Sequence, residues 1–235
     1  MMRKTTILLI LSIALLTISC GGNTQEPPMP NADPSSESLV PTPTTGDKNE
    51  RDKGNAVKIT LKPASIARYR ITEQLARRNL PNDAVGETKD IIGDIYLKPD
   101  GSVDSKPSLI TIGLASLKSD EGRRDRYVRN NTLETESYST ATVIPKEFID
   151  LPWPLPNNQE FLFSMLTDTT IHGVTSNLLW KVTATSEGGQ LSGSAKTNFT
   201  FDTFKLTQPK LAFILSIKDN IRLELDFLAE VRDRP

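Results

Sequence analysis

The sequence predicts an all-β, mainly antiparallel fold, in which about eight strands close into an extended barrel with one short helix inserted. Three observations indicate this fold. Apolar and polar residues alternate with period two in several segments, turn residues separate these segments, and only residues 119–133 have a helical character. An antiparallel sheet of many strands hides its edges by closing into a barrel. A sandwich with a packed interior is the alternative that the same alternation allows.

The last strand is the best defined. From Ile221 to Arg232, apolar residues alternate with mostly charged ones, so one face lies in a core and the other in water. The same pattern predicts further strands at residues 57–62, 67–75, 91–97, 108–117, 139–147, 160–171, 178–184 and 195–201. Gly188 and Gly189 predict a hairpin turn, and Pro99 to Gly101 predict another turn. Several inward positions carry small residues that leave room inside a barrel, namely Gly93, Ala184, Ala195, Thr197 and Ala229.

Residues 119–133 interrupt the run of strands. Their acidic residues come early and their basic residues come later, which suits the dipole of a helix. Ser119 or Asp120 can cap its N-terminus. We therefore expect a short helix or helical loop here.

The N-terminus has the features of an export signal. Arg3 and Lys4 precede an apolar run over residues 7–18, which is too short to span a bilayer and is typical of a signal peptide. Small residues on either side of Cys20, the only cysteine, resemble a lipobox. Processing would cleave before Cys20 and attach acyl chains to it, so Cys20 is the predicted lipidation site. An ordinary signal peptide followed by a chance cysteine is the alternative.

The chain is expected to have three regions. Residues 1–19 form the signal peptide, residues 20–55 form the lipidated cysteine with a Pro/Ser/Thr-rich disordered tether, and residues 56–235 form the barrel domain. The domain is therefore expected outside the cytoplasm, periplasmic or extracellular, and anchored to the cell envelope membrane. A formal net charge of -1, with no basic stripe, argues against a nucleic-acid partner.

Three segments in register resemble the YceI-like family. The resemblance is carried by Ser116-Leu117, Arg124-Asp125, Leu133 and Tyr138-Ser139-Thr140-Ala141, by the stretch TIHGVT at 170–175, and by residues 219–225. The chain departs from the family at residues 68–73, which lack the usual histidine, and at Ser139, which replaces a proline. The resemblance implies a lipocalin-like barrel with an internal apolar tunnel. It also implies a protein that binds polyisoprenoid or other long-chain amphiphiles and is not an enzyme.

The candidate site residues follow from the predicted strands and from the few polar groups of note. The aromatic residues expected to face inward, as core or as cavity wall, are Trp180, Phe199, Phe201 and Phe227. Arg124 could hold an anionic head group, or it could lie on a solvated helix face with local ion pairs. His172, the sole histidine, could be a general base or head-group contact, or a turn residue that bonds the backbone beside Gly173.

Three functions are compatible with these features. The leading one is an exported, membrane-anchored lipoprotein that binds a polyisoprenoid, quinone-like or fatty molecule inside the barrel. The second is a structural or interaction lipoprotein with a packed barrel and no small ligand. The third is an enzyme that uses His172. No catalytic residue, metal or cofactor is assigned. The expected partners are an apolar small molecule and the membrane, and a homodimer is compatible with the sequence.

Overall fold

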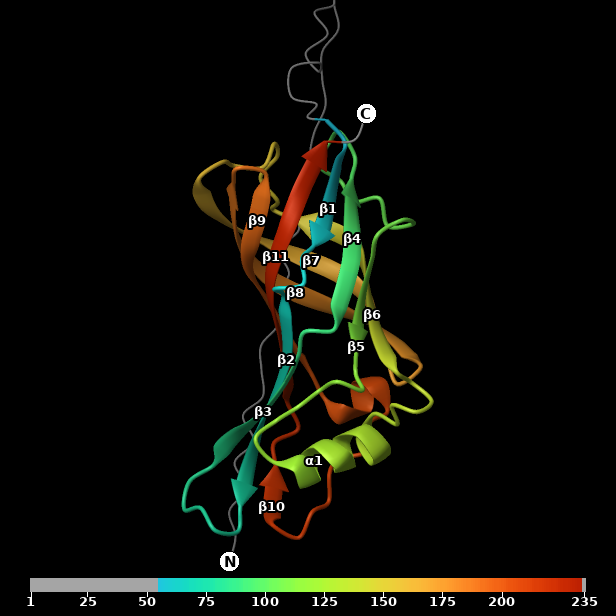
Figure 1. Ribbon diagram of the computed structural model, residues 1–235, viewed down its shortest axis with the longest axis vertical. Coiled ribbons are helices and arrows are strands. Elements are labelled where there is room, and N and C mark those ends of the chain that lie inside the picture. The colour runs from blue at the N-terminus through green and yellow to red at the C-terminus, as the bar shows by residue number, and fades with distance from the viewer. Residues whose placement is uncertain (1–54, 234–235) are drawn as a thin grey trace, which may run out of the picture. The chain divides into compact units, whose positions relative to one another are not determined.

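The computed structural model describes residues 55–233 (Figure 1). The predicted signal peptide, Cys20 and the tether up to residue 54 lie outside the described residues. The first strands are β1 (Val57–Leu61), β2 (Ile66–Leu75), β3 (Asn82–Thr88), β4 (Ile91–Leu97) and β5 (Leu109–Gly113). The helix α1 (Gly122–Tyr127) and a π-helical turn, η1 (Val128–Thr132), follow. The remaining elements are β6 (Thr140–Ile149), β7 (Gln159–Ile171), β8 (Val174–Glu187), β9 (Gln190–Phe199), the 3-10 turn η2 (Phe201–Phe204), β10 (Ile214–Ile217) and β11 (Ile221–Asp233).

Eight of these strands form a closed antiparallel barrel. Their order around the ring is β1-β4-β5-β6-β7-β8-β9-β11, and β11 closes the ring by pairing with β1. The closing register runs from Val57 opposite Asp233 to Leu61 opposite Ala229. The predicted barrel of about eight strands with one short helix is therefore confirmed.

Strand β11 joins the barrel to a small extension. One edge of β11 pairs with β9, while the other edge pairs first with β2 and then with β1. Beyond the barrel, β2 pairs with β3 on one side and with β10 on the other, which gives a three-stranded extension. In Figure 1 the turn between β2 and β3 lies at the same end of the domain as β10 and α1.

The interior of the barrel holds the apolar face that alternation predicts. Ile221, Leu225 and Ala229 of β11 are buried. The buried apolar residues fall into two clusters inside the barrel, and Leu61, Phe163 and Phe227 are among the residues packed against both. No helix within residues 55–233 is long and apolar enough to cross a membrane.

Both predicted turns are present, and the one between β8 and β9 has the expected backbone. Gly188 and Gly189 have φ values of 57° and 77°. Positive φ at both central residues is what a type I′ hairpin turn requires, and glycine adopts it without steric cost.

Several expectations require correction. The strand predicted at 108–117 ends at Gly113, and the one predicted at 195–201 ends at Phe199. Phe201 instead begins η2, because Thr200 and Thr203 form a capping box that starts a helical turn there. The sequence also gave no indication of β3 or β10. The inward side of β3 carries Ala84 and Gly86, which are too small to produce a recognisable alternation.

The helix lies where the sequence predicts it, but a different residue caps it. The side chain of Glu121 accepts a hydrogen bond of 3.0 Å from the backbone N–H of Arg123, which makes Glu121 the N-cap rather than Ser119 or Asp120. The Ser119 hydroxyl instead donates to Asp125 over 2.6 Å. This hydrogen bond holds the segment before the helix against Asp125 of α1.

Candidate functional site

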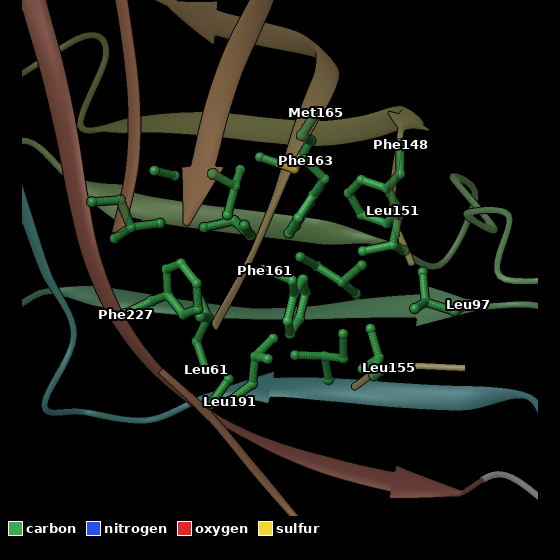
Figure 2. A pocket seen from close by; sticks show the side chains of 17 residues that line it. Leu61, Leu97, Phe148, Leu151, Leu155, Phe161, Phe163, Met165, Leu191 and Phe227 are labelled. Carbon is green, nitrogen blue, oxygen red and sulfur yellow. The ribbon is translucent and has the colours of Figure 1, made fainter. Parts of the chain in front are cut away.

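The barrel interior contains three adjoining apolar hollows, the first of which is shown in Figure 2. This first hollow has a volume of about 60 Å³ and is lined by 17 side chains, all of them aliphatic, aromatic or methionine. Phe148 meets Phe163 edge to face with ring centroids 5.4 Å apart, and Phe161 stacks on Phe163 at 6.1 Å. Phe227 of β11 lies on the wall of this hollow.

The loop between β6 and β7 covers one end of the first hollow. Leu151 and Leu155 from this loop line the hollow. Trp153 lies between them in sequence and fixes the loop, because its indole N–H donates to the carbonyl of Pro99 over 2.9 Å. Gly101 provides the space for this ring. Trp153 is therefore part of the loop that covers this hollow.

The second hollow continues the first along the barrel. Its volume is about 80 Å³, and it shares Ile110, Met165, Ala195 and Leu225 with the first hollow. Met165 at this junction has a flexible, unbranched side chain, which adapts readily to a guest. Trp180 lies on the wall of the second hollow.

A buried hydroxyl network holds Trp180 in place. Its indole N–H donates to Thr167 Oγ1 over 3.2 Å, and the Thr167 and Thr169 hydroxyls are 2.8 Å apart. The Thr167 hydroxyl also contacts the carbonyl of Leu178 at 3.2 Å. The one polar group of Trp180 is therefore satisfied away from the hollow, and only its ring contributes to the wall.

The third hollow is the largest, at about 110 Å³. It shares Tyr69, Leu114, Leu117, Ile171 and Leu223 with the second hollow, so the three apolar hollows lie in series with shared side chains between them, and we call this series the passage. Phe199 and Phe201 line the third hollow, as do residues of η1 and of the segment after η2, including Val128, Leu206 and Pro209. Loops and turns therefore bound this end of the passage in addition to strands.

Tyr69 is the polar aromatic residue of the passage. It lines both the second and the third hollow, and its ring lies over Gly86 of the neighbouring strand β3. Burial raises the pKa of the Tyr69 phenol to about 12. The phenol is therefore neutral at physiological pH, and its hydroxyl lies near Gly86 of β3 and within the electrostatic influence of the charged groups around Arg124, so the ring is the part that lines the passage.

Arg124 is buried and fastens α1 to β2, contrary to the interpretation that it lies on a solvated helix face. Its Nη2 lies 2.5 Å from Glu73 Oε1, and its Nη1 lies 2.6 Å from Asp120 Oδ1. Burial alone would lower the pKa of Arg124, but the hydrogen bond to Asp120 and the charge of Glu73 hold it above the ordinary value. Arg124 lines none of the three hollows.

His172 occupies the turn between β7 and β8, with φ of 53°. Its Nε2 is 3.6 Å from Glu134 Oε1, and its ring meets Tyr138 edge to face at 4.6 Å. His172 is therefore a turn residue beside a carboxylate, and it lines none of the three hollows. The structure thus gathers Trp180, Phe199, Phe201 and Phe227 around one passage and leaves Arg124 and His172 outside it.

Several residues of the passage were not singled out from the sequence. Phe161, Phe163 and Met165 follow one another at alternate positions of β7 and line the first hollow. Their spacing within the predicted strand 160–171 was the available signal. Tyr69 likewise lies in a predicted strand, 67–75, where Ala67, Tyr69 and Ile71 alternate with polar residues, so the same signal was available for it.

The fold and the passage define a class of protein: a closed antiparallel barrel with a hollow apolar interior. The family model of the YceI-like domain matches residues 69–229 of the sequence. The chain therefore belongs to the YceI-like family, as its sequence motifs indicated.

Two solved structures share the fold. A polyisoprenoid binding domain from Saccharophagus degradans, implicated in plant cell wall breakdown, has 16% sequence identity and a TM-score of 0.57, covering 74% of this chain and 98% of that one. BcnA of Burkholderia cenocepacia has 16% identity and a TM-score of 0.53, covering 72% and 98%. No curated protein matches the chain.

Proposed function

We propose that this protein binds a long-chain apolar or amphipathic molecule, of the polyisoprenoid, quinone or fatty-acyl kind, in the passage through its barrel. The observation that carries the proposal is the serial arrangement of the three apolar hollows, each of which shares lining residues with the next. Burial of a hydrocarbon chain in such a passage is favourable by about 25 cal/mol per Å² of apolar surface. The structural similarity to a polyisoprenoid binding domain supports the same class of ligand.

The ligand enters, in this proposal, at the third hollow. This hollow is the largest, and η1 and the segment around Leu206 and Pro209 bound it. Turns and loops move apart more easily than paired strands, because fewer backbone hydrogen bonds hold them.

A substitution at the junction of two hollows tests the binding proposal. Ala195 is buried and lines the first and second hollows, so Ala195→Leu places three more carbon atoms in the passage. We expect it to weaken binding of an apolar fluorescent probe, such as N-phenyl-1-naphthylamine, at least tenfold. Ala115→Leu, at an exposed loop position, is the matched control.

Native mass spectrometry of the protein purified from its own membranes completes the test. We expect it to retain an apolar molecule that a solvent extract identifies. A wild-type barrel that emerges empty from every preparation and excludes the probe would instead support a packed structural or interaction protein.

We further propose that the domain is exported and anchored through acyl chains on Cys20, which would keep the barrel close to a source of membrane lipids. The support is the apolar run before Cys20 and the absence of a second cysteine. Metabolic labelling with a fatty acid tests it. The wild type should carry the label and stay with the membranes during a salt wash, whereas Cys20→Ser should lose the label and be released by the same wash. Label on Cys20→Ser would exclude this anchor.

The proposed role is non-catalytic. His172 and its neighbour Glu134 lie outside the passage in which a ligand would be held. His172→Ala is therefore expected to leave ligand retention unchanged. If the wild type converted a retained molecule and His172→Ala did not, the enzymatic interpretation would be supported instead.

A further inference from the structure

The three-stranded extension ends in a projecting surface, which we call the tip and define as residues 76–81 and 208–215. Leu75 of β2 pairs with Ile214 of β10, so the two segments of the tip lie at the same end of the extension. The backbone N–H of Ala76 donates to the carbonyl of Phe213 over 3.0 Å, which joins the two segments. Figure 1 shows both at the end of the domain that carries α1.

Large apolar side chains are exposed at the tip. Leu80, in the turn between β2 and β3, is 76% exposed, and Leu215 of β10 is 66% exposed. Phe213 also belongs to the tip, and the Arg123 guanidinium of α1 lies over its ring, 5.7 Å from the centroid. Strand β10 is short and, within residues 55–233, pairs only with β2.

The charges of the tip have one sign. Its two segments, ARRNLP and QPKLAFIL, contain Arg77, Arg78 and Lys210 and no acidic residue. All three basic side chains are exposed. The nearby acidic groups Asp83 and Asp120 are paired with Arg222 and Arg124, respectively. The tip therefore presents a net positive charge around protruding leucines, which is the composition of a surface that lies on anionic lipid.

The tip also adjoins the largest of the three hollows. Leu206 and Pro209 line this third hollow, and Pro209 itself belongs to the tip. A membrane in contact with the tip would thus lie beside the entrance that we propose for the ligand.

We infer that the tip is a docking surface for anionic membranes, in which Leu80 and Leu215 enter the boundary between head groups and acyl chains while Arg77, Arg78 and Lys210 bind lipid phosphates. The docking itself needs only these exposed groups. Its use in loading or unloading a ligand rests on the proposed function of the passage.

The chain is long enough for an anchored domain to place its tip on the same membrane. Roughly 35 residues separate Cys20 from Asn55, and a fully extended chain of that length spans at most about 120 Å. The path from Asn55 to the end of β2 comprises about 20 residues, or at most about 70 Å. The proposed lipid anchor therefore leaves the tip within reach of the bilayer.

Vesicle co-sedimentation of residues 21–235 tests the inference. This chain contains every strand of the closed barrel, so the folded unit is complete. We expect it to bind vesicles of phosphatidylcholine with phosphatidylglycerol, to bind phosphatidylcholine alone much more weakly, and to be released by salt. Leu80→Ser combined with Leu215→Ser should weaken binding at least tenfold, and Arg77→Gln or Arg78→Gln about fivefold each.

Matched controls separate the tip from general surface hydrophobicity. Leu162 and Leu179 on the barrel wall are 67% and 50% exposed, and their double replacement by serine should leave vesicle binding unchanged. Equal losses from wall and tip variants, or no preference for anionic vesicles, would overturn the inference. So would a stable dimer that the tip variant abolishes, because the tip would then contact a second copy of the chain.

Probe uptake distinguishes failure of docking from failure of the proposed function. Tip variants should retain full binding of N-phenyl-1-naphthylamine, whereas Ala195→Leu should lose probe binding and keep vesicle binding. If the wild type binds the probe but not the vesicles, only the docking inference fails. If it binds the vesicles but not the probe, only the proposed function fails.

Discussion

Replacement of Arg124 by methionine tests whether the buried ion pair fastens α1 to the extension. Glu73 is 2% exposed and Arg124 4% exposed, and their charged atoms are 2.5 Å apart. Arg124→Met keeps much of the apolar stem but leaves the Glu73 carboxylate buried, with the amide of Asn82 at 3.5 Å as its remaining side-chain hydrogen-bond partner. Breaking one side of a buried pair destabilises a protein by about 3–5 kcal/mol, so we expect a loss of that size.

The double variant Glu73→Leu with Arg124→Met removes both charges and should recover most of the loss, to within about 1 kcal/mol of the wild type. Urea unfolding of residues 21–235, followed by tryptophan fluorescence, measures all the free energies. Arg222→Met is the matched control, because its pair with Asp83 is solvent-exposed and should contribute less than about 1 kcal/mol. Two results would refute the reasoning. One is a loss below about 1 kcal/mol for Arg124→Met, and the other is a double variant whose loss equals the sum of the losses of Glu73→Leu and Arg124→Met alone.

Two further predictions concern a polar and a strained position of the domain. The pKa of Tyr69 is raised from about 10 in the unfolded chain to about 12 by burial, so its contribution to stability is fully present below pH 10 and is lost as the pH rises to 12. In urea unfolding across this pH range, we expect the free energy of unfolding of the wild type to fall by about 2–3 kcal/mol more than that of Tyr69→Phe. If the two free energies fell in parallel with pH, the raised pKa of Tyr69 would be contradicted. Gly101 has φ of 81°, and a Cβ there would lie 2.6 Å from the ring of Trp153, so Gly101→Ala should cost more than the 1–2 kcal/mol of backbone strain alone. Gly188→Ala, with φ of 57° and open space around it, should show only the backbone term, and equal losses for the two variants would show that the ring does not limit the site.

The parts of the fold that the sequence predicted are those with a strong local signal. The alternation from Ile221 to Arg232 predicted β11, and the two glycines at 188–189 predicted the turn before β9. Strand β3 was missed because Gly86 has no side chain at the position where the Tyr69 ring of β2 packs. A contact between two strands of this kind leaves no pattern in the sequence of β3 alone.

The candidate site was predictable to a similar degree. Trp180, Phe199 and Phe227 lie in strands that the alternation predicts, and the structure places them among the residues that line the hollows. The role of Arg124 was not predictable, because its partner Glu73 is 51 residues away and the pairing depends on how α1 packs on β2. A charge run in a helix carries no information about which of its members is buried.

The place where the barrel closes has a consequence for how the chain folds. Closure joins β1 to β11, so residues near the beginning of the domain must meet residues at its very end. A chain that still lacks the 13 residues of β11 leaves β9, β1 and β2 with unpaired edges. Such edges favour pairing with other chains, and contacts of this sequence separation form slowly. The domain therefore completes its folding only after synthesis of its last strand, and loss of that strand should cause aggregation rather than a smaller stable barrel.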